Sequence, residues 1–283
     1  MAGRLIVCPT PIGNLGDMTQ RTLDELAAAD VVCAEDTRVT GKLLAHFGIE
    51  KRLERLDEAA ITRQAARVSE RIVAGQTIAF CSDAGMPGVS DPGARLIEAT
   101  RAAGGDVVVL PGASAAVTAY VASGFNNPRF YFGGFFPRKD AERRDTLAAL
   151  GALDAVLMFY ESPRRIVAAL DAVVDVFPNR EVAVCRELTK IHEEVARGPV
   201  ADVRDDFARR DVEGGVKGEI VLVIGPPTQA EEAARKQDAA ASAADRAAEL
   251  VAAGELTRKE IVKVLRDEFG IARNEAYDLA MKA

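Results

Sequence analysis

The chain has 283 residues, of which 36 are lysine or arginine and 43 are aspartate or glutamate, so its formal net charge at pH 7 is −7. Hydrophobic residues make up 48% and charged residues 28%, a globular composition that argues against wholesale disorder, collagen and coiled coil. The length suggests about two domains, each large enough to bury a core. The acidic balance argues against a protein that coats nucleic acid through bulk charge, and leaves room only for local basic patches.

No apolar run approaches the ~18 residues that a membrane-spanning helix needs, and the first residues do not form a signal peptide. We therefore expect a soluble, cytoplasmic protein without a membrane partner. The cysteines are far apart in sequence, and each lies in or at the end of an apolar run: Cys8, Cys33, Cys81 and Cys185. This pattern indicates buried thiols in a reducing compartment, and we expect neither disulfides nor a metal site.

The first 112 residues alternate short apolar runs with helical stretches. The apolar runs predict buried strands at Leu5–Cys8, Val31–Ala34, Ile78–Cys81 and Val107–Leu110. The segments between them predict helices at Thr22–Ala29, Thr40–Phe47, Thr62–Ala74 and Pro92–Ala103. Such alternation is typical of βα units on a mostly parallel sheet, whose ligand sites lie outside the carboxyl ends of the strands. The loops that follow these strands are therefore the candidate sites.

A second block of α/β character follows. It predicts strands at Phe130–Phe136, Ala155–Tyr160, Val182–Arg186, Glu193–Gly198 and Ile220–Ile224, and helices near Ala141–Leu150, Arg164–Val176 and Ala201–Arg210. Two consecutive strands around Cys185 and Val195 have no helix between them, which indicates a mixed sheet. We predict an N-terminal α/β domain over residues 1–115 and a second, mixed-sheet α/β domain over residues 116–226.

The remaining residues, 227–283, predict a helical tail. The stretch Gln229–Ala253 is rich in Ala, Glu, Lys and Arg, and is compatible with a helix or with a partly ordered linker. Thr257 and Glu260 form a capping-box pattern, and Gly270 ends the helix that follows. With a second short helix at Ala272–Lys282, this pair resembles a helix-turn-helix. We favour a small hairpin that packs on the body or on a partner subunit.

The first two loops carry polar residues and glycine. Pro9–Asp17 contains glycines that allow close approach to the backbone, but it lacks the spacing of a dinucleotide fingerprint. Gly41-Lys42 lacks the upstream glycine of a phosphate-binding loop, so nucleotide hydrolysis is also disfavoured. The second loop, Ala34-Glu35-Asp36-Thr37-Arg38, predicts either charged site residues or a helix cap with a local ion pair.

The third loop is the most informative. It reads Ser82-Asp83-Ala84-Gly85-Met86-Pro87-Gly88-Val89-Ser90-Asp91-Pro92-Gly93. Three glycines, two prolines and two aspartates with bare backbone suit a stiff loop that cradles a small ligand. The fourth loop, Pro111-Gly112-Ala113-Ser114-Ala115, places small residues at a helix start, where backbone donors can meet a carboxylate.

Together these loops carry a family resemblance. The chain resembles the tetrapyrrole methylase superfamily, and within it the ribosomal RNA small subunit methyltransferase I family. The matching segments cover both α/β blocks to about residue 225: Pro9–Asp17 with Thr19, Ala34–Arg38, Ser82–Gly93, Pro111–Ala115, Phe159–Arg165, Glu187–Glu194 and Lys217–Glu219.

The resemblance implies two α/β domains with S-adenosylmethionine in the cleft between them, and a homodimer. It also implies methylation of the ribose 2′-oxygen of a cytidine in the decoding region of 16S ribosomal RNA, either as free RNA or in the small ribosomal subunit. Carried onto this chain, the implied cofactor residues of the first block are Pro9, Gly13, Asp83, Ala84, Gly85, Val89, Ser114 and Ala115. Those of the second block are Phe159, Tyr160, Leu188 and Gly218.

Methyl transfer from a sulfonium is an in-line displacement that depends mainly on alignment, but a ribose hydroxyl is a poor nucleophile. We therefore expect Glu35 or Asp36 to orient or deprotonate the hydroxyl, and Arg38 or Lys190 to steady the developing charge. Basic residues near the aromatic runs predict RNA contacts at Arg138, Lys139, Arg164 and Arg165. A further candidate RNA-binding face comprises Arg52, Arg55, Arg63, Arg67 and Arg71.

Two alternatives stay open. A tetrapyrrole methyltransferase on the same fold would methylate a porphyrinoid without any RNA, although its Ser82–Gly93 loop would be expected in a more glycine-rich form. A non-catalytic RNA-binding or assembly protein would need only the basic clusters and the tail, and would leave that loop unexplained. One experiment distinguishes these three functions. Labelled S-adenosylmethionine is incubated with small subunits, naked RNA or a tetrapyrrole precursor, and the molecule that becomes labelled is identified.

Overall fold

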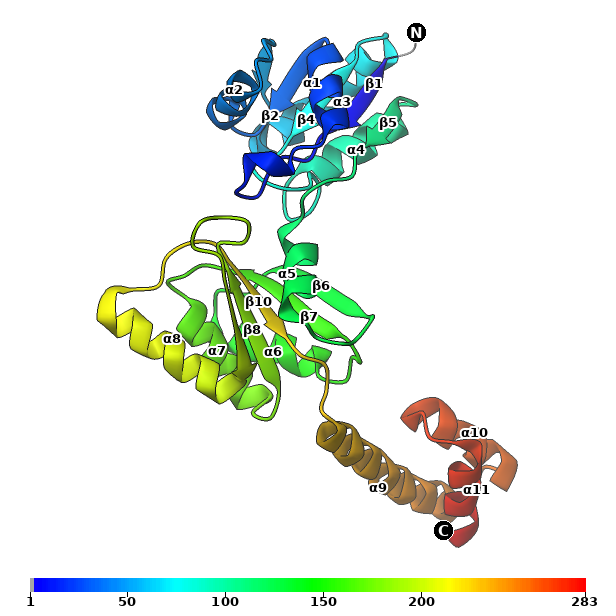
Figure 1. Cartoon of the computed structure of the whole chain (residues 1–283). Coiled ribbons are helices and arrows are strands. Elements are labelled where there is room, and N and C mark those ends of the chain that lie inside the picture. Colours follow the sequence, from blue (N-terminus) through cyan, green and yellow to red (C-terminus); the bar gives the residue numbers. More distant parts are fainter. Residues whose placement is uncertain (1–2) are drawn as a thin grey trace. The chain divides into compact units, whose positions relative to one another are not determined.

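The structure is a computed structural model that describes residues 3–283 (Figure 1). The chain forms a larger unit that ends at Pro226 and a smaller unit, Pro227–Ala283. The larger unit contains two five-stranded sheets with their helices, and the smaller unit contains only helices. Each unit has its own apolar core.

The first sheet is parallel throughout, as the alternating pattern predicted. Its order is β3-β2-β4-β1-β5, with β1 at Arg4–Val7, β2 at Val31–Ala34, β3 at Leu53–Arg55, β4 at Ile78–Cys81 and β5 at Asp106–Val109. The edge strand β3 is an addition to the predicted strands. Its sequence, Leu-Glu-Arg, has no apolar run, and the strand forms because it pairs with β2.

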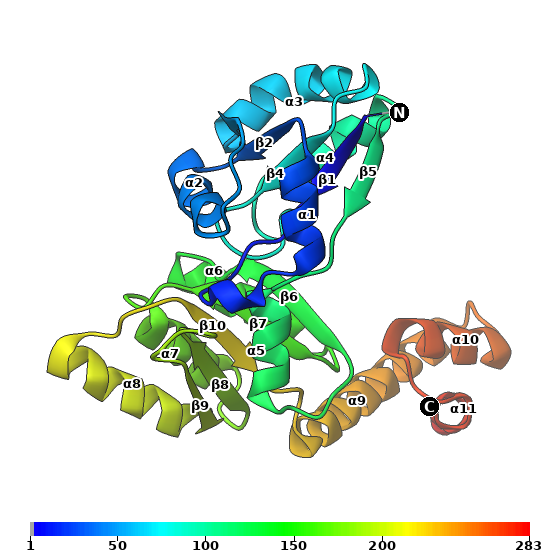
Figure 2. The ribbon, with the colours of Figure 1, turned by 45° about the horizontal axis from the view of Figure 1, so that its top comes forward.

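Helices cover both faces of this sheet (Figure 2). They are α1 at Gln20–Ala28, preceded by a short 3-10 turn at Leu15–Asp17, α2 at Thr37–His46, α3 at Glu58–Val73 and α4 at Gly93–Ala102. Leu26 and Leu44 of α1 and α2 pack on one face of the sheet. Ile61 of α3 and Leu96 of α4 pack on the other. Burial on both faces explains why the central strands β2 and β4 are apolar at every position rather than at alternate ones.

The second sheet is mixed, as predicted, with the order β6-β7-β10-β8-β9. Only β6 and β7 are parallel, and the other neighbours are antiparallel. The strands are β6 at Phe130–Phe135, β7 at Val156–Glu161, β8 at Glu181–Arg186, β9 at Glu194–Pro199 and β10 at Ile220–Ile224.

The two faces of the second sheet are covered unequally. Three helices pack on one face: α6 at Asp140–Leu150, α7 at Ile166–Val176 and α8 at Val200–Gly214. On the opposite face the short helix α5, Ala115–Ser123, packs together with Ile12 from the first loop of the chain. The part of this face that α5 leaves uncovered is available to form a site.

The smaller unit is a three-helix arrangement of α9 at Gln229–Ala253, α10 at Arg258–Phe269 and α11 at Arg273–Lys282. Residues 229–253, for which the sequence was compatible with either a helix or a linker, form a helix that begins with a capping box of Thr228 and Glu231. The predicted box of Thr257 and Glu260 is present at the start of α10. The hairpin of α10 and α11 packs on α9, around a core of Ala243, Ala247, Ile261, Leu265, Ala276 and Ala280.

The four cysteines are buried, free thiols. Within residues 3–283, none of the helices combines the length and the apolar character needed to cross a membrane.

Candidate active site

A cavity of about 430 Å³ lies between the carboxyl ends of the first sheet and the exposed face of the second. Its volume falls within the range of small-molecule sites in proteins. The loops after β2 and β4, the start of α5, and strands β7 and β10 all contribute to its wall. The site therefore forms where the parallel sheet was expected to bind a ligand, and the mixed sheet closes it from the other side.

The loop after β4 contributes main-chain atoms to the wall of the cavity. Gly85 forms a two-way bridge with Thr10, in which each backbone N–H donates to the other's carbonyl oxygen at 3.0 Å. Gly85 has a φ of +78°, a conformation that glycine adopts without strain. Asp91 Oδ1 accepts the backbone N–H groups of Gly88 and Gly93, each at 2.7 Å. The loop is therefore held from within before any ligand binds.

The second sheet supplies an apolar wall. Tyr160, Val221 and Cys185 lie side by side on β7, β10 and β8, and all three line the cavity. Leu188, from the loop after β8, is buried beside them. Burial raises the pKa of Tyr160, against a hydrogen bond with the backbone of Ala116 in α5. The wall offers an apolar surface to a flat or aliphatic ligand.

Phe159 points away from this wall. Successive residues of a strand face opposite sides of the sheet, and Phe159 is 1% exposed in the core beneath α6, α7 and α8. Of the two neighbouring aromatic residues that the sequence assigned to the cofactor, only Tyr160 therefore lines the cavity. Phe159 supports the sheet from behind.

The loop between β8 and β9 is held in place by ion pairs. Lys190 Nζ contacts Glu187 Oε1 at 2.8 Å and Glu219 Oε2 at 2.9 Å. The side chain of Lys190 also lies against Gly13, where a Cβ would overlap it. Gly218 has a φ of +96°, and a Cβ there would overlap the side chain of Glu187. Lys190 thus links the loop between β8 and β9 to the first loop of the chain, beside the cavity. The missing side chain of Gly218 allows Glu187 to pack closely against its backbone.

Glu35 directly follows β2 and lines the cavity. Burial raises its pKa to about 7, and the nearby carboxylates of Asp91 and Asp83 add to the rise. Its Oε1 atom is buried and has no hydrogen-bond partner within residues 3–283. A carboxyl group with a pKa near neutrality and a free oxygen can accept a proton at physiological pH.

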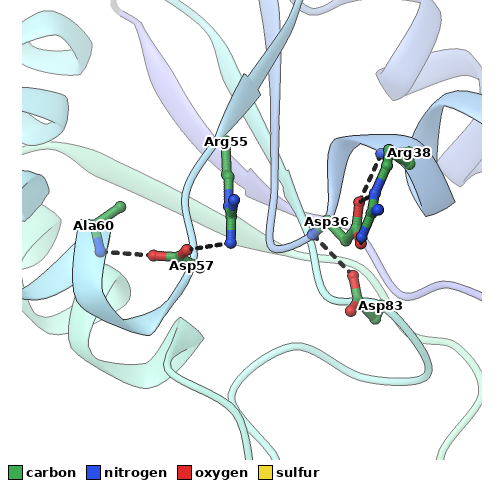
Figure 3. A network of polar contacts seen from close by, with 6 residues as sticks. All are labelled: Asp36, Arg38, Arg55, Asp57, Ala60 and Asp83. Atoms are coloured by element: carbon green, nitrogen blue, oxygen red, sulfur yellow. Dashed lines mark hydrogen bonds and ion pairs between the residues drawn. The ribbon is translucent and has the colours of Figure 1, made fainter.

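Asp36, the next residue, has a different environment. Its side chain caps α2 by accepting the backbone N–H of Arg38 at 2.8 Å, and it forms an ion pair with the guanidinium of Arg38. These contacts hold the pKa of Asp36 far below its usual range. Its own backbone N–H donates to Asp83 Oδ1 at 3.0 Å, which ties the loop after β2 to the loop after β4 (Figure 3).

The predicted site residues divide into those that line the cavity and those that lie beside it. The lining residues are Glu35, Asp83, Ala84, Gly85, Val89, Ser114, Ala115, Tyr160, Leu188 and Gly218. Pro9 instead lies against Gly112, and Asp36, Arg38 and Lys190 take part in the ion pairs described above. Ile12, Cys185 and Val221 also line the cavity. The sequence did not predict them, because Val221 and Cys185 join Tyr160 on the wall through the strand pairing of β7, β10 and β8.

The predicted RNA-contacting residues have different surroundings. Arg165 pairs with Glu161, whose buried carboxylate also lies 3.8 Å from Arg143. Lys139 pairs with Glu142 on the exposed surface. Arg138 and Arg164 are exposed. Arg165 is thus engaged in a structural ion pair, whereas the other three are accessible to a partner.

The lining of the cavity is acidic. It includes Glu35, Asp83, Asp91, Glu161 and Glu219, and among residues 3–283 no lysine or arginine belongs to it. An acidic, partly apolar cavity suits a ligand that carries positive charge beside an apolar body.

Comparisons with known proteins agree on the family. The family model for tetrapyrrole (corrin/porphyrin) methylases matches residues 4–204. Ribosomal RNA small subunit methyltransferase I of Escherichia coli O157:H7 is 40% identical, and the match covers 99% of this chain and 95% of that protein. The protein of the same name from Bacillus subtilis (strain 168) is 38% identical over 98% of this chain and 93% of its own.

Solved structures show the same fold at lower identity. Diphthine synthase aligns with a TM-score of 0.60 at 16% identity, over 79% of this chain and 90% of its own. The methyltransferase CobJ aligns with a TM-score of 0.59 at 19% identity, over 79% of this chain and 94% of its own. At these identities the comparison concerns the fold alone.

Proposed function

Since the chain belongs to the tetrapyrrole (corrin/porphyrin) methylase family and is a methyltransferase, we propose that it methylates the ribose 2′-oxygen of a cytidine in the decoding region of 16S ribosomal RNA. The observation that carries the RNA substrate is the 40% identity, over nearly the whole chain, to a ribosomal RNA small subunit methyltransferase. Such a substrate implies a cytoplasmic enzyme. A homodimer remains a prediction that light scattering would test.

We propose S-adenosylmethionine as the methyl donor, which supplies an electrophilic methyl group on a sulfonium when bound. The cavity fits this cosubstrate in charge and shape. The sulfonium and amino groups are positive and the lining is acidic, while Tyr160, Leu188 and Val221 offer an apolar wall to the adenosine. The N-terminus of α5 at Ser114 and Ala115 would meet the carboxylate of the methionine part.

We propose that Glu35 orients the 2′-hydroxyl and accepts its proton. Its free, buried oxygen and its pKa of about 7 support this assignment over Asp36. The carboxylate of Asp36 already caps α2 and pairs with Arg38, which leaves it a weak base. Asp36 then acts as a positioning residue that keeps the loop after β2 against Asp83.

Lys190 has a supporting role in this proposal. Because its ammonium group is held by Glu187 and Glu219, its charge is already compensated and is poorly placed to stabilise an alkoxide. We propose that it anchors the loop that carries Leu188 against the first loop of the chain at Gly13. Arg138, Lys139 and Arg164 are proposed RNA contacts at the surface, and Arg165 is a structural partner of Glu161.

The experiment offers labelled S-adenosylmethionine and the full chain to three substrates: undermethylated small subunits, protein-free 16S RNA and a tetrapyrrole precursor. We expect label on the RNA, and nuclease mapping should locate it at a cytidine resistant to alkaline cleavage on its 3′ side. Label on the tetrapyrrole alone would contradict the proposal and favour the porphyrinoid alternative. Label on an RNA base would keep the RNA substrate and reject the ribose target.

A further inference from the structure

The acidic residues of the cavity would repel the phosphates of an RNA substrate. Each nucleotide brings a phosphate, and the lining contains no lysine or arginine among residues 3–283. Of its five acidic residues, Glu161 and Glu219 are paired with cations outside the lining. Glu35, Asp83 and Asp91 have no ion pair in the described part of the chain. The chain as a whole also has a net charge of −7. Like charges at short range repel, so cations close to the cavity must compensate if a ribose is to reach Glu35.

Two exposed arginines lie at the carboxyl edge of the first sheet. Arg38 follows β2 and Arg55 ends β3, and their side chains are 87% and 71% exposed. The strands are neighbours in register, with Ala34 paired to Arg55. Glu35 follows Ala34 directly. Both guanidinium groups therefore belong to the same edge as the proposed base.

The two arginines are held in the same way. Arg38 pairs with Asp36, the N-cap of α2, and Arg55 pairs at 2.8 Å with Asp57, the N-cap of α3. Each aspartate also accepts a backbone N–H of its helix, from Arg38 and from Ala60 (Figure 3). The carboxylates are thus fixed by the helix ends, and they orient the guanidinium groups that they hold.

Both pairs are electrostatically close to the cavity. Asp57 is among the carboxylates that raise the pKa of Glu35, and Asp83 of the lining helps to raise the pKa of Arg38. Figure 3 shows Arg55 lying between Asp57 and the loop of Asp36. None of the four residues of these pairs belongs to the lining of the cavity.

We propose that Arg38 and Arg55 bind RNA phosphates on either side of the nucleotide that is methylated. Arginine matches phosphate geometry with two parallel hydrogen bonds. An exposed ion pair contributes little to stability, so exchanging or sharing the aspartate partner costs little. In the free protein the aspartates would keep the guanidinium groups oriented. This inference rests on the proposed RNA substrate and names the groups that position it.

Neighbouring arginines do not share this geometry. Arg52 precedes β3 at the opposite edge of the sheet, and pairs with Glu54. Arg71 of α3 pairs with the same Glu54 at 2.7 Å. Two exposed arginines elsewhere form a matched control, because each is paired with an aspartate and neither lines the cavity. Arg129 precedes β6 and Arg209 lies on α8, and their side chains are 69% and 61% exposed.

The test measures the affinity of the full chain for undermethylated small subunits as a function of salt concentration, together with kcat, KM and the Kd of S-adenosylmethionine. For the double variant R38A/R55A we expect a 10- to 100-fold rise in the subunit Kd and in KM. We also expect a salt slope lower by about two, one for each phosphate contact. The Kd of S-adenosylmethionine should be unchanged. R129A/R209A, which removes the same two charges, should stay within about 2-fold of wild type, and R38K/R55K should recover much of the salt slope.

Failure of this inference differs from failure of the proposed function. If the wild-type chain methylates the RNA and R38A/R55A retains the wild-type Kd and salt slope, the phosphate contacts are overturned and the function stands. If the wild-type chain binds subunits in a way that requires Arg38 and Arg55 but transfers no methyl group to RNA, the contacts stand and the function is overturned. Equal losses in R129A/R209A and R38A/R55A would also overturn the contacts, because they would show an effect of overall charge.

Discussion

The two sheets of the larger unit contribute to the cavity in different ways. The parallel first sheet presents its edge, so the site receives loops, helix ends and the charged residues Glu35, Asp83 and Asp91. The mixed second sheet presents part of a face, so the site receives alternate apolar side chains such as Tyr160 and Val221. The ends of the parallel strands thus contribute the charged residues of the site, and the face of the mixed sheet contributes its apolar wall.

The difference follows from how each sheet is covered. Helices on both faces bury the first sheet, and only its ends can meet a ligand. Helix α5 covers only part of one face of the second sheet, and the remainder becomes a wall. Substitutions of Glu35, Arg38 and Arg55 at the first sheet's edge should therefore act on catalysis and RNA binding, and those in the second sheet should act on cofactor binding or on stability.

The largest expected effect comes from the first sheet. Glu35→Gln should lower kcat by about 10²- to 10⁴-fold, because it removes the proposed proton acceptor. The wild-type rate should rise with pH through about 7, where the carboxyl group ionises, and this step should be lost in the variant. Single-turnover rates from pH 5.5 to 8.5 measure both effects.

The control for that experiment is Glu50→Gln, at an exposed position before β3. It should retain the wild-type rate and pH profile, and both variants should bind S-adenosylmethionine as the wild type does. A kcat for Glu35→Gln within 3-fold of wild type would remove Glu35 from the proposed chemistry.

Neighbouring residues of β7 should separate stability from binding. Phe159→Ala should lower the free energy of unfolding by about 3–5 kcal/mol, since it leaves a cavity in the core under α6, α7 and α8. Tyr160→Phe should cost only about 1 kcal/mol, for the hydrogen bond with Ala116, and should act mainly on cofactor affinity. Urea unfolding followed by circular dichroism tests the contrast, which equal losses in the two variants would contradict.

Two glycines of the α8–β10 connection provide a smaller, matched comparison. Gly218→Ala should weaken S-adenosylmethionine binding by about 10-fold, because it combines a positive φ with overlap against Glu187 beside the cavity. Gly215→Ala also has a positive φ, of +76°, but its Cβ would enter open space. It should lower stability modestly and leave cofactor affinity unchanged. Isothermal titration of both variants with S-adenosylmethionine shows whether the overlap with Glu187 or the backbone strain weakens cofactor binding.

The smallest expected effect is on stability. The pKa of Glu35 is raised from 4.5 to about 7 by folding, so the folded chain holds this proton more tightly than the unfolded chain. Stability from this group is therefore lost as pH rises from about 4.5 through 7. Relative to wild type, Glu35→Gln should gain about 1 kcal/mol between pH 5 and pH 8, a value reduced because the group is partly exposed. Thermal unfolding at the two pH values measures the gain. A gain that is the same at both pH values would contradict it.

Local patterns in the sequence predicted much of this architecture. The alternation of apolar and helical stretches indicates the parallel first sheet, and the loop Ser82–Gly93 indicates a ligand site without any knowledge of the fold. Glycines, prolines and aspartates predict such loops because their effects on φ and on capping are local. The three-residue strand β3 escaped because pairing with β2, rather than its own composition, makes it a strand.

The roles of charged residues were less predictable, because they depend on neighbours far along the chain. Arg165 follows an aromatic run, as an RNA-binding arginine would, yet it forms an ion pair with the buried Glu161. Lys190 has the charge to stabilise an alkoxide, yet Glu187 and Glu219 compensate that charge. Nothing near Asp36 in the sequence distinguishes it from Glu35 as a base. Burial and the approach of Asp83 and Asp91 make the difference in the folded chain.

The sequence by itself determined the type of the first sheet, the position of its binding loops and the capping box that starts α10, since periodicity, turn chemistry and capping act within a few residues. Only the tertiary structure decided that Tyr160 faces the cavity while Phe159 supports it from behind. It alone brought Arg38 and Arg55 to one edge beside Glu35. These outcomes depend on strand register and on desolvation, which arise when segments far apart in the chain pack together.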